Sequence, residues 1–251
     1  MKNILIFLLA IFILSGCGIT APAITSTVIP ETPIPTATQQ LTSTPATVSE
    51  LSAYAFPDSI DPSQKYLFYL HGKIIEDQGI PAVSPDYGEY EYEAILKKLA
   101  SYGFVVISEQ RPKNADVMKY AERVVAQVTE LLKAGVPAKN ITVIGASKGA
   151  GIALFISYLL KNEEINFVVM GTCDPDTVKS LKQNNMLLYG NVLAIRDSVD
   201  ELSGSCQDLF AFSEGKGLAR HDEITLHIGT GHGILYKPLD EWILPAVEWA
   251  R

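Results

Sequence analysis

The residues most suited to covalent chemistry lie in Gly145-Ala146-Ser147-Lys148-Gly149, where a serine is framed by two glycines. A serine hydroxyl becomes a nucleophile when a histidine accepts its proton and a carboxylate orients that histidine. An apolar run at 141–144 precedes the pentapeptide, and an apolar helical pattern at 150–160 follows it. This strand–turn–helix setting predicts a sharp turn that exposes the Ser147 hydroxyl. The alternative is an ordinary glycine-rich turn in which Ser147 caps the helix.

Six short apolar runs are expected to form the strands that position this turn. Most are hydrophobic at nearly every position, which is typical of parallel strands covered on both faces. Helical patterns alternate with them at 92–102, 117–132 and 150–160, and a last helix near the C-terminus is expected to be kinked or split at Pro245. This alternation predicts a three-layer α/β fold with a mostly parallel sheet and right-handed crossovers. The apolar runs are 66–70, 104–108, 141–144, 165–170, 187–195 and 224–228.

Composition excludes several classes of protein. The 251 residues carry 20 Lys and Arg against 28 Asp and Glu, a formal charge of −8, without a basic cluster. Nucleic acid is therefore not an expected partner, because phosphate binding needs concentrated positive charge. A hydrophobic content of 47% provides for a large core and excludes disorder of the whole chain. No His, Cys or carboxylate cluster has metal-ligand spacing and no glycine-rich phosphate loop is present, so no metal or cofactor is expected.

With its serine motif, the order of its elements and a His71-Gly72 pair after the first strand run, the chain resembles the α/β-hydrolase family from about residue 60 onward. The resemblance implies a catalytic triad in the order serine, acid, histidine. It also implies an oxyanion hole in which the backbone N–H of Lys73, or of Ile74, joins that of Lys148. His71 precedes the serine, so an orienting role suits it better than that of a base.

The same order places the base after the serine, which leaves His221, His227 and His232. His232 lies in Gly229-Thr230-Gly231-His232-Gly233, directly after a strand run, in the kind of loop where the family carries its catalytic histidine. His227 falls within a strand pattern, where a core or sheet-face histidine is the simpler interpretation. His221 lies in a polar stretch that is typical of a solvated loop. The resemblance therefore implies His232 as the base.

Asp200 is the acid that the resemblance implies. When the aliphatic run at 192–195 is aligned with the family's strand, Asp200 falls at the acid position and Asp197 at a turn residue. An aspartate in a turn commonly closes that turn through its side chain. Asp197 stays open as an alternative acid, as does Asp174, which follows the preceding strand.

These residues predict hydrolysis of a carboxylic ester or a related acyl bond through an acyl-enzyme, with a small acyl compound as substrate. Leu187 lies 16 positions after Gly171, too few for a large helical lid, so a minimal domain with an open site is expected. A loop at 74–93 is expected to wall that site, with Lys148 either favouring an anionic group or pointing into water. The alternatives to an enzyme are a ligand-binding lipoprotein and a hydrolase-fold protein that has lost its activity.

The N-terminus predicts export and lipidation. Lys2 and the apolar run at 4–14 are typical of a signal peptide, because a membrane-spanning helix needs about 20 apolar residues. Leu14-Ser15-Gly16-Cys17 resembles the lipobox of bacterial lipoproteins, in which the cysteine becomes the acylated first residue of the mature chain. The alternative is an ordinary signal peptide that ends near a chance cysteine. The expected location is the bacterial cell envelope, outside the cytoplasm, with a lipid anchor in the membrane.

The chain is therefore expected to have a signal peptide at 1–16, a lipid-anchored tether at 17–50 and a catalytic domain at 51–251. Thr and Pro fill 14 of the 32 positions from 19 to 50, a composition that keeps a chain extended. In the domain, Cys173 and Cys206 are an even pair in an exported protein, and a disulfide between them is expected. Two buried free thiols are the alternative.

Replacement of Cys17 by serine is expected to leave the precursor unlipidated and to abolish its partitioning into the detergent phase. The reason is that no other segment is expected to anchor the mature chain. Detergent phase separation of cells that produce each form measures the partitioning. Retention of the Cys17→Ser protein in membranes would instead indicate an uncleaved N-terminal helix.

Overall fold

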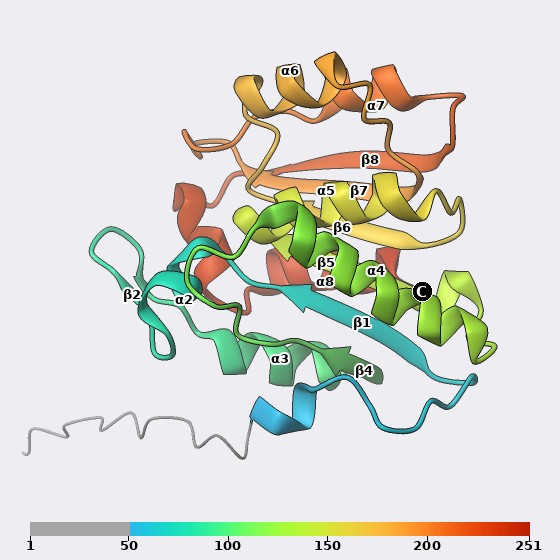
Figure 1. Cartoon of the computed structure of the whole chain (residues 1–251). Helices are drawn as coiled ribbons and strands as arrows, with labels where there is room; N and C mark the ends of the chain where they lie inside the picture. The colour runs from blue at the N-terminus through green and yellow to red at the C-terminus, as the bar shows by residue number, and fades with distance from the viewer. Residues whose placement is uncertain (1–50) are drawn as a thin grey trace, which may run out of the picture. The chain divides into compact units, whose positions relative to one another are not determined.

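The computed structural model describes residues 51–251, in which a central sheet is covered by helices on both faces (Figure 1). The predicted signal peptide, the predicted lipidation site Cys17 and the tether at 17–50 lie outside the described residues. The sheet has six strands in the order β4-β1-β5-β6-β7-β8, and every neighbouring pair is parallel. The strands are β1 Lys65–Leu70, β4 Phe104–Ile107, β5 Ile141–Ala146, β6 Asn166–Met170, β7 Gly190–Asp197 and β8 Leu218–Leu226. The predicted three-layer α/β fold with a parallel sheet is confirmed.

Strand β1 shows why the strands appear in the sequence as continuous apolar runs. Every residue from Tyr66 to Leu70 is buried. Tyr66, Phe68 and Leu70 belong to the core on one face of the sheet, and Leu67 and Tyr69 belong to the core on the other. Successive side chains of a strand point to opposite faces, so a strand that is covered on both sides needs apolar residues throughout.

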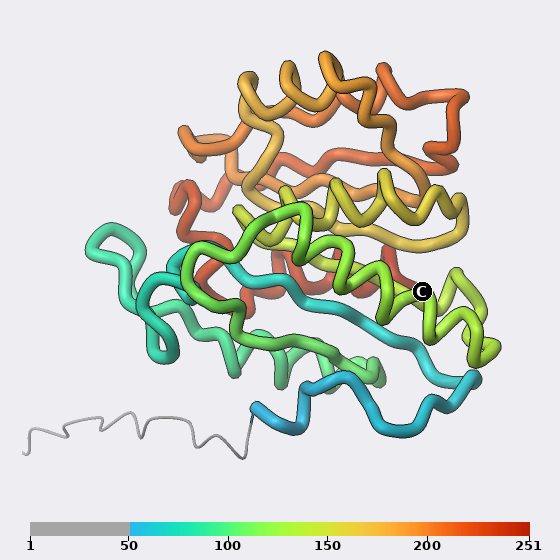
Figure 2. The backbone as a smooth tube through the Cα atoms, in the orientation of Figure 1, coloured from blue at the N-terminus to red at the C-terminus, as the bar shows by residue number. Residues whose placement is uncertain are grey.

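Two layers of helices complete these cores, and the backbone tube shows the sheet between them (Figure 2). Helices α4, α5, α6 and α7 pack on one face, and α3 and α8 pack on the other. None of the helices in the described part of the chain is both long and apolar enough to cross a membrane. The bounds are α3 Tyr92–Ala100, α4 Val117–Lys133, α5 Lys148–Leu160, α6 Pro175–Gln183, α7 Gln207–Ser213 and α8 Asp240–Trp249.

The last strand and the last helix differ from their predicted form. Strand β8 begins at Leu218 rather than at 224, so His221 lies in a strand and not in a solvated loop. This strand is at the sheet edge and is only partly buried, so it tolerates polar residues. Because its first residues are polar, they show no apolar run that would indicate a strand. Helix α8 continues through Pro245 without a break, because its apolar face, which includes Trp242, is buried in the core.

The segment at 74–93, expected to be a loop, contains regular structure. It holds most of helix α2 (Lys73–Gln78) and an antiparallel pair of short strands, β2 (Val83–Ser84) and β3 (Gly88–Glu89). Ile75 and Tyr90 are buried in the same core as α3 and α8. This packing fixes α2 directly after the carboxyl end of β1.

Cys173 and Cys206 form the predicted disulfide, with their Cα atoms 5.2 Å apart. The two cysteines follow the carboxyl ends of β6 and β7, which are neighbours in the sheet. The bond spans a sequence separation of 33. Closing a loop of about this length contributes roughly 3–4 kcal/mol by restricting the unfolded chain. The disulfide therefore restrains the segment after β7, which includes Asp200.

Candidate active site

Ser147 lies on a strained turn between β5 and α5. Its φ is 52°, in the left-handed region that non-glycine residues rarely occupy, and its N–H donates to Met170 O at 2.8 Å. A Cβ on Gly145 would lie 2.3 Å from Gly149 O, and a Cβ on Gly149 would lie 1.9 Å from Leu70 O, so both glycines are required. The Ser147 side chain makes no capping hydrogen bond to α5, which does not support the interpretation of the serine as a helix cap.

Ser147 and His232 line the same cavity, which has a volume of about 170 Å³. A Cβ on Gly72 would lie 3.7 Å from Ser147 Cβ, so the residues that follow β1 pass directly beside the serine. The structure thus brings Ser147, His232 and the predicted oxyanion residue Lys73 to one cavity beside the carboxyl ends of β1 and β5. The other lining residues are Gly72, Ile74, Tyr87, Tyr90, Leu202, Leu235 and Tyr236.

His232 contacts the carboxylate of Asp200. Its Nδ1 lies 2.8 Å from Asp200 Oδ2, and both side chains are buried. His232 belongs to the 3-10 helix η3 (Gly231–Tyr236), and Asp200 lies in the turn after β7. Burial favours the neutral form of the Asp200 carboxyl, but the hydrogen bond and charge of His232 and a bond from the Leu202 N–H outweigh it and lower the pKa. The ionised carboxylate can therefore orient the imidazole.

Asp197 binds the loop that carries His232 rather than the imidazole. It is the last residue of β7, and its Oδ2 accepts the N–H of Thr230 at 2.9 Å and that of Gly231 at 3.1 Å. Burial alone would raise the pKa of this carboxyl, but the backbone hydrogen bonds outweigh burial and lower it. The two aspartates at this strand end therefore act on His232 in different ways, one through the backbone and one through the ring.

The other candidate residues lie away from this contact. Asp174 is the N-cap of α6 and accepts the Thr177 N–H at 3.0 Å. His227 follows β8 and is exposed, although the apolar run at 224–228 predicted that it lies within a strand. Neither His221 nor His227 lines the cavity that holds Ser147. Among residues 51–251, no group of three or more His, Cys, Asp or Glu side chains is arranged to hold a metal ion.

Two helices begin beside the serine. Lys73 is the first residue of α2 and Lys148 is the first residue of α5, with Gly72 and Ser147 as the respective N-caps. The N–H groups in the first turn of a helix have no partner within that helix and lie at the positive end of its dipole. The two backbone groups expected in an oxyanion hole therefore come from two helix starts on either side of Ser147.

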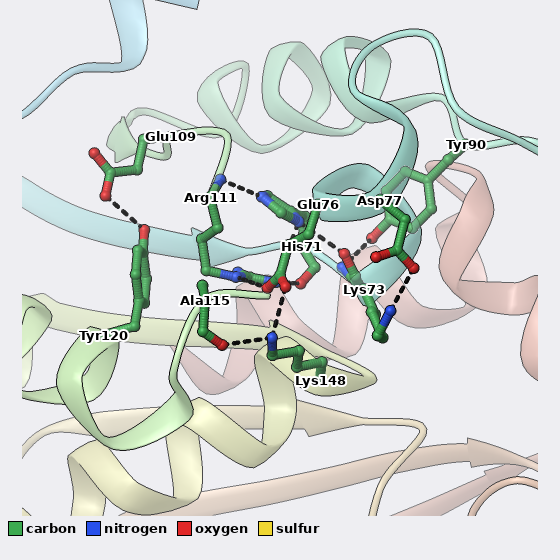
Figure 3. Close-up of polar contacts among 11 residues, drawn as sticks. His71, Lys73, Glu76, Asp77, Tyr90, Glu109, Arg111, Ala115, Tyr120 and Lys148 are labelled. Carbon is green, nitrogen blue, oxygen red and sulfur yellow. Dashed lines mark hydrogen bonds and ion pairs between the residues drawn. The ribbon is translucent and has the colours of Figure 1, made fainter. Parts of the chain in front are cut away.

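A buried charge network joins these two helices (Figure 3). Glu76 Oε1 accepts from Arg111 Nε at 2.6 Å, and Glu76 Oε2 accepts from Lys148 Nζ at 2.6 Å. Lys148 Nζ also donates to Ala115 O at 2.7 Å, so its ammonium is held within the protein and does not point freely into water. The partners of Glu76 are 35 and 72 positions away in the chain, and no spacing in the sequence indicates the network.

His71 joins the same network as a neutral ring. Its Nε2 accepts the Arg111 N–H at 3.0 Å, which leaves Nδ1 to donate to Gly72 O at 2.8 Å. Burial, and after it the charge of Arg111, lowers the pKa of His71 to about 3. Arg111 also donates to the His71 carbonyl. A ring held in one neutral tautomer suits an orienting role.

No family model and no curated protein matches the chain. Among solved structures, SOBER1 from Arabidopsis thaliana is similar at 13% identity with a TM-score of 0.51, over 75% of this chain and 98% of that one. A protein described as a predicted CIB-like hydrolase, from Thermoplasma acidophilum, has 14% identity, a TM-score of 0.48 and coverage of 76% and 87%. A lipase-esterase related protein from Clostridium acetobutylicum has 15% identity, a TM-score of 0.42 and coverage of 76% and 96%. At such low identity the similarity shows the fold alone. That fold is of the α/β-hydrolase type.

The packing around His232 can be tested at Gly171. This residue follows β6 with a φ of 62°, and a Cβ there would lie 2.7 Å from Leu235 Cδ1 and 2.9 Å from His232 Cε1. Gly171→Ala is expected to lower the free energy of unfolding by about 1–3 kcal/mol, through backbone strain and crowding. Urea denaturation measures the change.

Gly151→Ala is the matched control, because a Cβ on Gly151 in α5 meets no atom within 4 Å. It is expected to raise the free energy of unfolding by about 0.5–1 kcal/mol, the usual difference between glycine and alanine inside a helix. A Gly171→Ala protein as stable as the wild type would contradict the close packing described around His232.

Proposed function

We propose that the chain is a serine hydrolase that cleaves a carboxylic ester or a related acyl bond. Ser147 is the nucleophile, His232 the general base and Asp200 the acid that orients the base. The observation that carries the proposal is the cavity shared by Ser147 and His232, together with the 2.8 Å contact between His232 and the buried Asp200 carboxylate. The chain order of serine, acid and histidine supports it.

The proposed mechanism follows from the hydrogen bond at Nδ1. A carboxylate only accepts hydrogen bonds, so Asp200 selects the tautomer of His232 with a proton on Nδ1 and leaves Nε2 to take the Ser147 proton. The serine oxygen then attacks the substrate carbonyl, and the N–H groups of Lys73 and Lys148 stabilise the oxyanion. The imidazolium protonates the leaving alcohol, and water releases the acyl group through the same steps.

The cavity favours a small, uncharged group. Its volume of about 170 Å³ can hold one small group of a substrate, and its lining is mostly apolar. Tyr236 packs against Tyr87 and Tyr90, with ring centroids 5.2 Å and 5.0 Å apart, and forms an aromatic wall with them. The ammonium of Lys73 is paired with Asp77, which leaves it less able to attract an anion. A short-chain aryl ester is therefore a suitable probe substrate.

Lipidation at Cys17 would place this activity at the bacterial cell envelope, with residues 17–50 as the tether and the membrane as the partner. The Cys173–Cys206 disulfide supports an extracytoplasmic location, because disulfides persist in oxidising compartments. The proposed reaction uses only the triad side chains, backbone N–H groups and water, and so requires no cofactor.

Ser147→Ala is expected to lower the turnover of a short-chain aryl ester by about 10⁶-fold, because the nucleophile is lost. Its melting temperature should remain close to that of the wild type. A fluorophosphonate probe should label the wild-type chain at Ser147 and leave the variant unlabelled. A folded wild-type chain that is never labelled would favour a binding protein or an inactive hydrolase fold. A Ser147→Ala protein with most of its activity would refute the proposal.

Asp200→Asn and Asp197→Asn separate the roles of the two carboxylates. An amide at position 200 allows the wrong tautomer of His232, and kcat is expected to fall about 10⁴-fold. An amide at position 197 still offers an acceptor to Thr230 and Gly231, so kcat should fall by less than about 100-fold, while stability falls by about 1–2 kcal/mol. Steady-state kinetics and urea denaturation measure these effects. A larger loss of kcat in Asp197→Asn than in Asp200→Asn would show that the acid is wrongly assigned.

A further inference from the structure

A buried ion network lies beside the proposed active site without belonging to the triad. The side chains of Glu76 and Arg111 are fully buried, and that of Lys148 is 18% exposed. Removing charged groups from water is costly, and the attraction between them offsets that cost only in good geometry. The network therefore need not stabilise the folded protein. Its location beside Ser147 makes a role in the active site the better explanation.

The location of Glu76 relates it to both oxyanion donors. It lies in α2, in the turn that begins with Lys73, whose N–H is the first donor. Its Oε2 accepts from Nζ of Lys148, whose own backbone N–H is the second donor. One carboxylate thus links the helix that presents the first donor to the residue that presents the second (Figure 3).

Arg111 holds this carboxylate and the chain before Lys73 at the same time. Its Nε donates to Glu76, its backbone N–H donates to the His71 ring, and its guanidinium donates to the His71 carbonyl. The His71 ring in turn donates to Gly72 O. The first oxyanion donor is therefore restrained on both sides, by His71 and Gly72 before it and by Glu76 after it.

We propose that Glu76, held by Arg111, is a positioning residue that sets the separation of the two oxyanion donors around Ser147 through its ion pair with Lys148. The inference rests on the proposed hydrolase function. Oxyanion donors are most effective when they are already held where the charge develops and need not reorient during the reaction. A displacement of about 1 Å in such groups can slow a reaction by about 100-fold.

Two substitutions break this link in different ways. Glu76→Gln leaves the cations of Arg111 and Lys148 without their anion, and an uncompensated buried charge can prevent folding. Lys148→Met removes the ion pair between α5 and α2, and keeps both the backbone N–H of position 148 and the Glu76–Arg111 pair. Its melting temperature is therefore expected to stay close to that of the wild type. Lys148→Met is the decisive variant.

Glu109→Gln is the matched control. Glu109 lies in the same segment as Arg111, and its carboxylate pairs with Arg123 at the surface, with 37% of the Glu109 side chain exposed. It also accepts from the Tyr120 hydroxyl at 2.8 Å. The substitution makes the same chemical change as Glu76→Gln and removes an ion pair. It leaves the contacts of Glu76 with Arg111 and Lys148 in place (Figure 3).

The assays use the full-length chain, a short-chain aryl ester and phenylboronic acid. The boron forms a tetrahedral adduct with a serine oxygen, so the affinity for this inhibitor reports on the oxyanion hole. Lys148→Met is expected to lower kcat about 10–100-fold with little change in KM, and to weaken inhibition by a similar factor. Glu76→Gln, where it folds, should lose at least as much. Glu109→Gln should leave kcat, KM and inhibition within about twofold of the wild type.

The outcomes separate this proposal from the one on which it rests. A folded Lys148→Met protein with wild-type kcat and boronate affinity would overturn the positioning role and leave the hydrolase proposal intact. An equal loss in Glu109→Gln would also overturn it, because any change of charge near the site would then have the same effect. A wild-type chain that neither hydrolyses the ester nor reacts with a fluorophosphonate would refute the hydrolase proposal, and the positioning role would fall with it.

Discussion

Helix α5 approaches the end of β1 so closely that only a glycine fits at position 149, where a Cβ would lie 1.9 Å from the Leu70 carbonyl oxygen. This contact places the turn at Ser147 against the segment that leads from β1 into α2. The proposed chemistry depends on that contact, because the backbone donors of Lys73 and Lys148 come from different strand ends and can act on one oxygen only when they are adjacent.

The groups around this contact are held by bonds between strand ends rather than within single loops. Asp197 at the end of β7 binds the backbone that precedes His232, and Asp200 in the following turn binds the imidazole. The disulfide ties the segment after β7 to the segment after β6. Functional side chains on loops are positioned in this way by a rigid scaffold, which here is a sheet with a core on each face.

Ionisable groups near the cavity differ in charge state because their environments differ. His71 is buried beside Arg111 and stays neutral, whereas Asp200 stays ionised because its hydrogen bonds outweigh its burial. Glu76 is surrounded by two cations and links the helices on either side of the serine. A neutral histidine, an ionised aspartate and a glutamate paired with two cations thus lie within one region, and the surroundings of each side chain set its charge state.

The sequence by itself determined the features that depend on neighbouring residues. The apolar runs predicted the parallel sheet, the glycines around Ser147 predicted the turn, and the pair of cysteines predicted the disulfide. Tertiary structure decided between the two aspartates: Asp200, which the resemblance implied, contacts His232, whereas Asp197, the open alternative, binds the backbone of Thr230 and Gly231. It also decided the start of β8, the continuity of α8 through Pro245 and the Glu76 network, whose partners are 35 and 72 positions away. Such contacts arise only when packing brings distant segments together, and no local pattern of residue types encodes them.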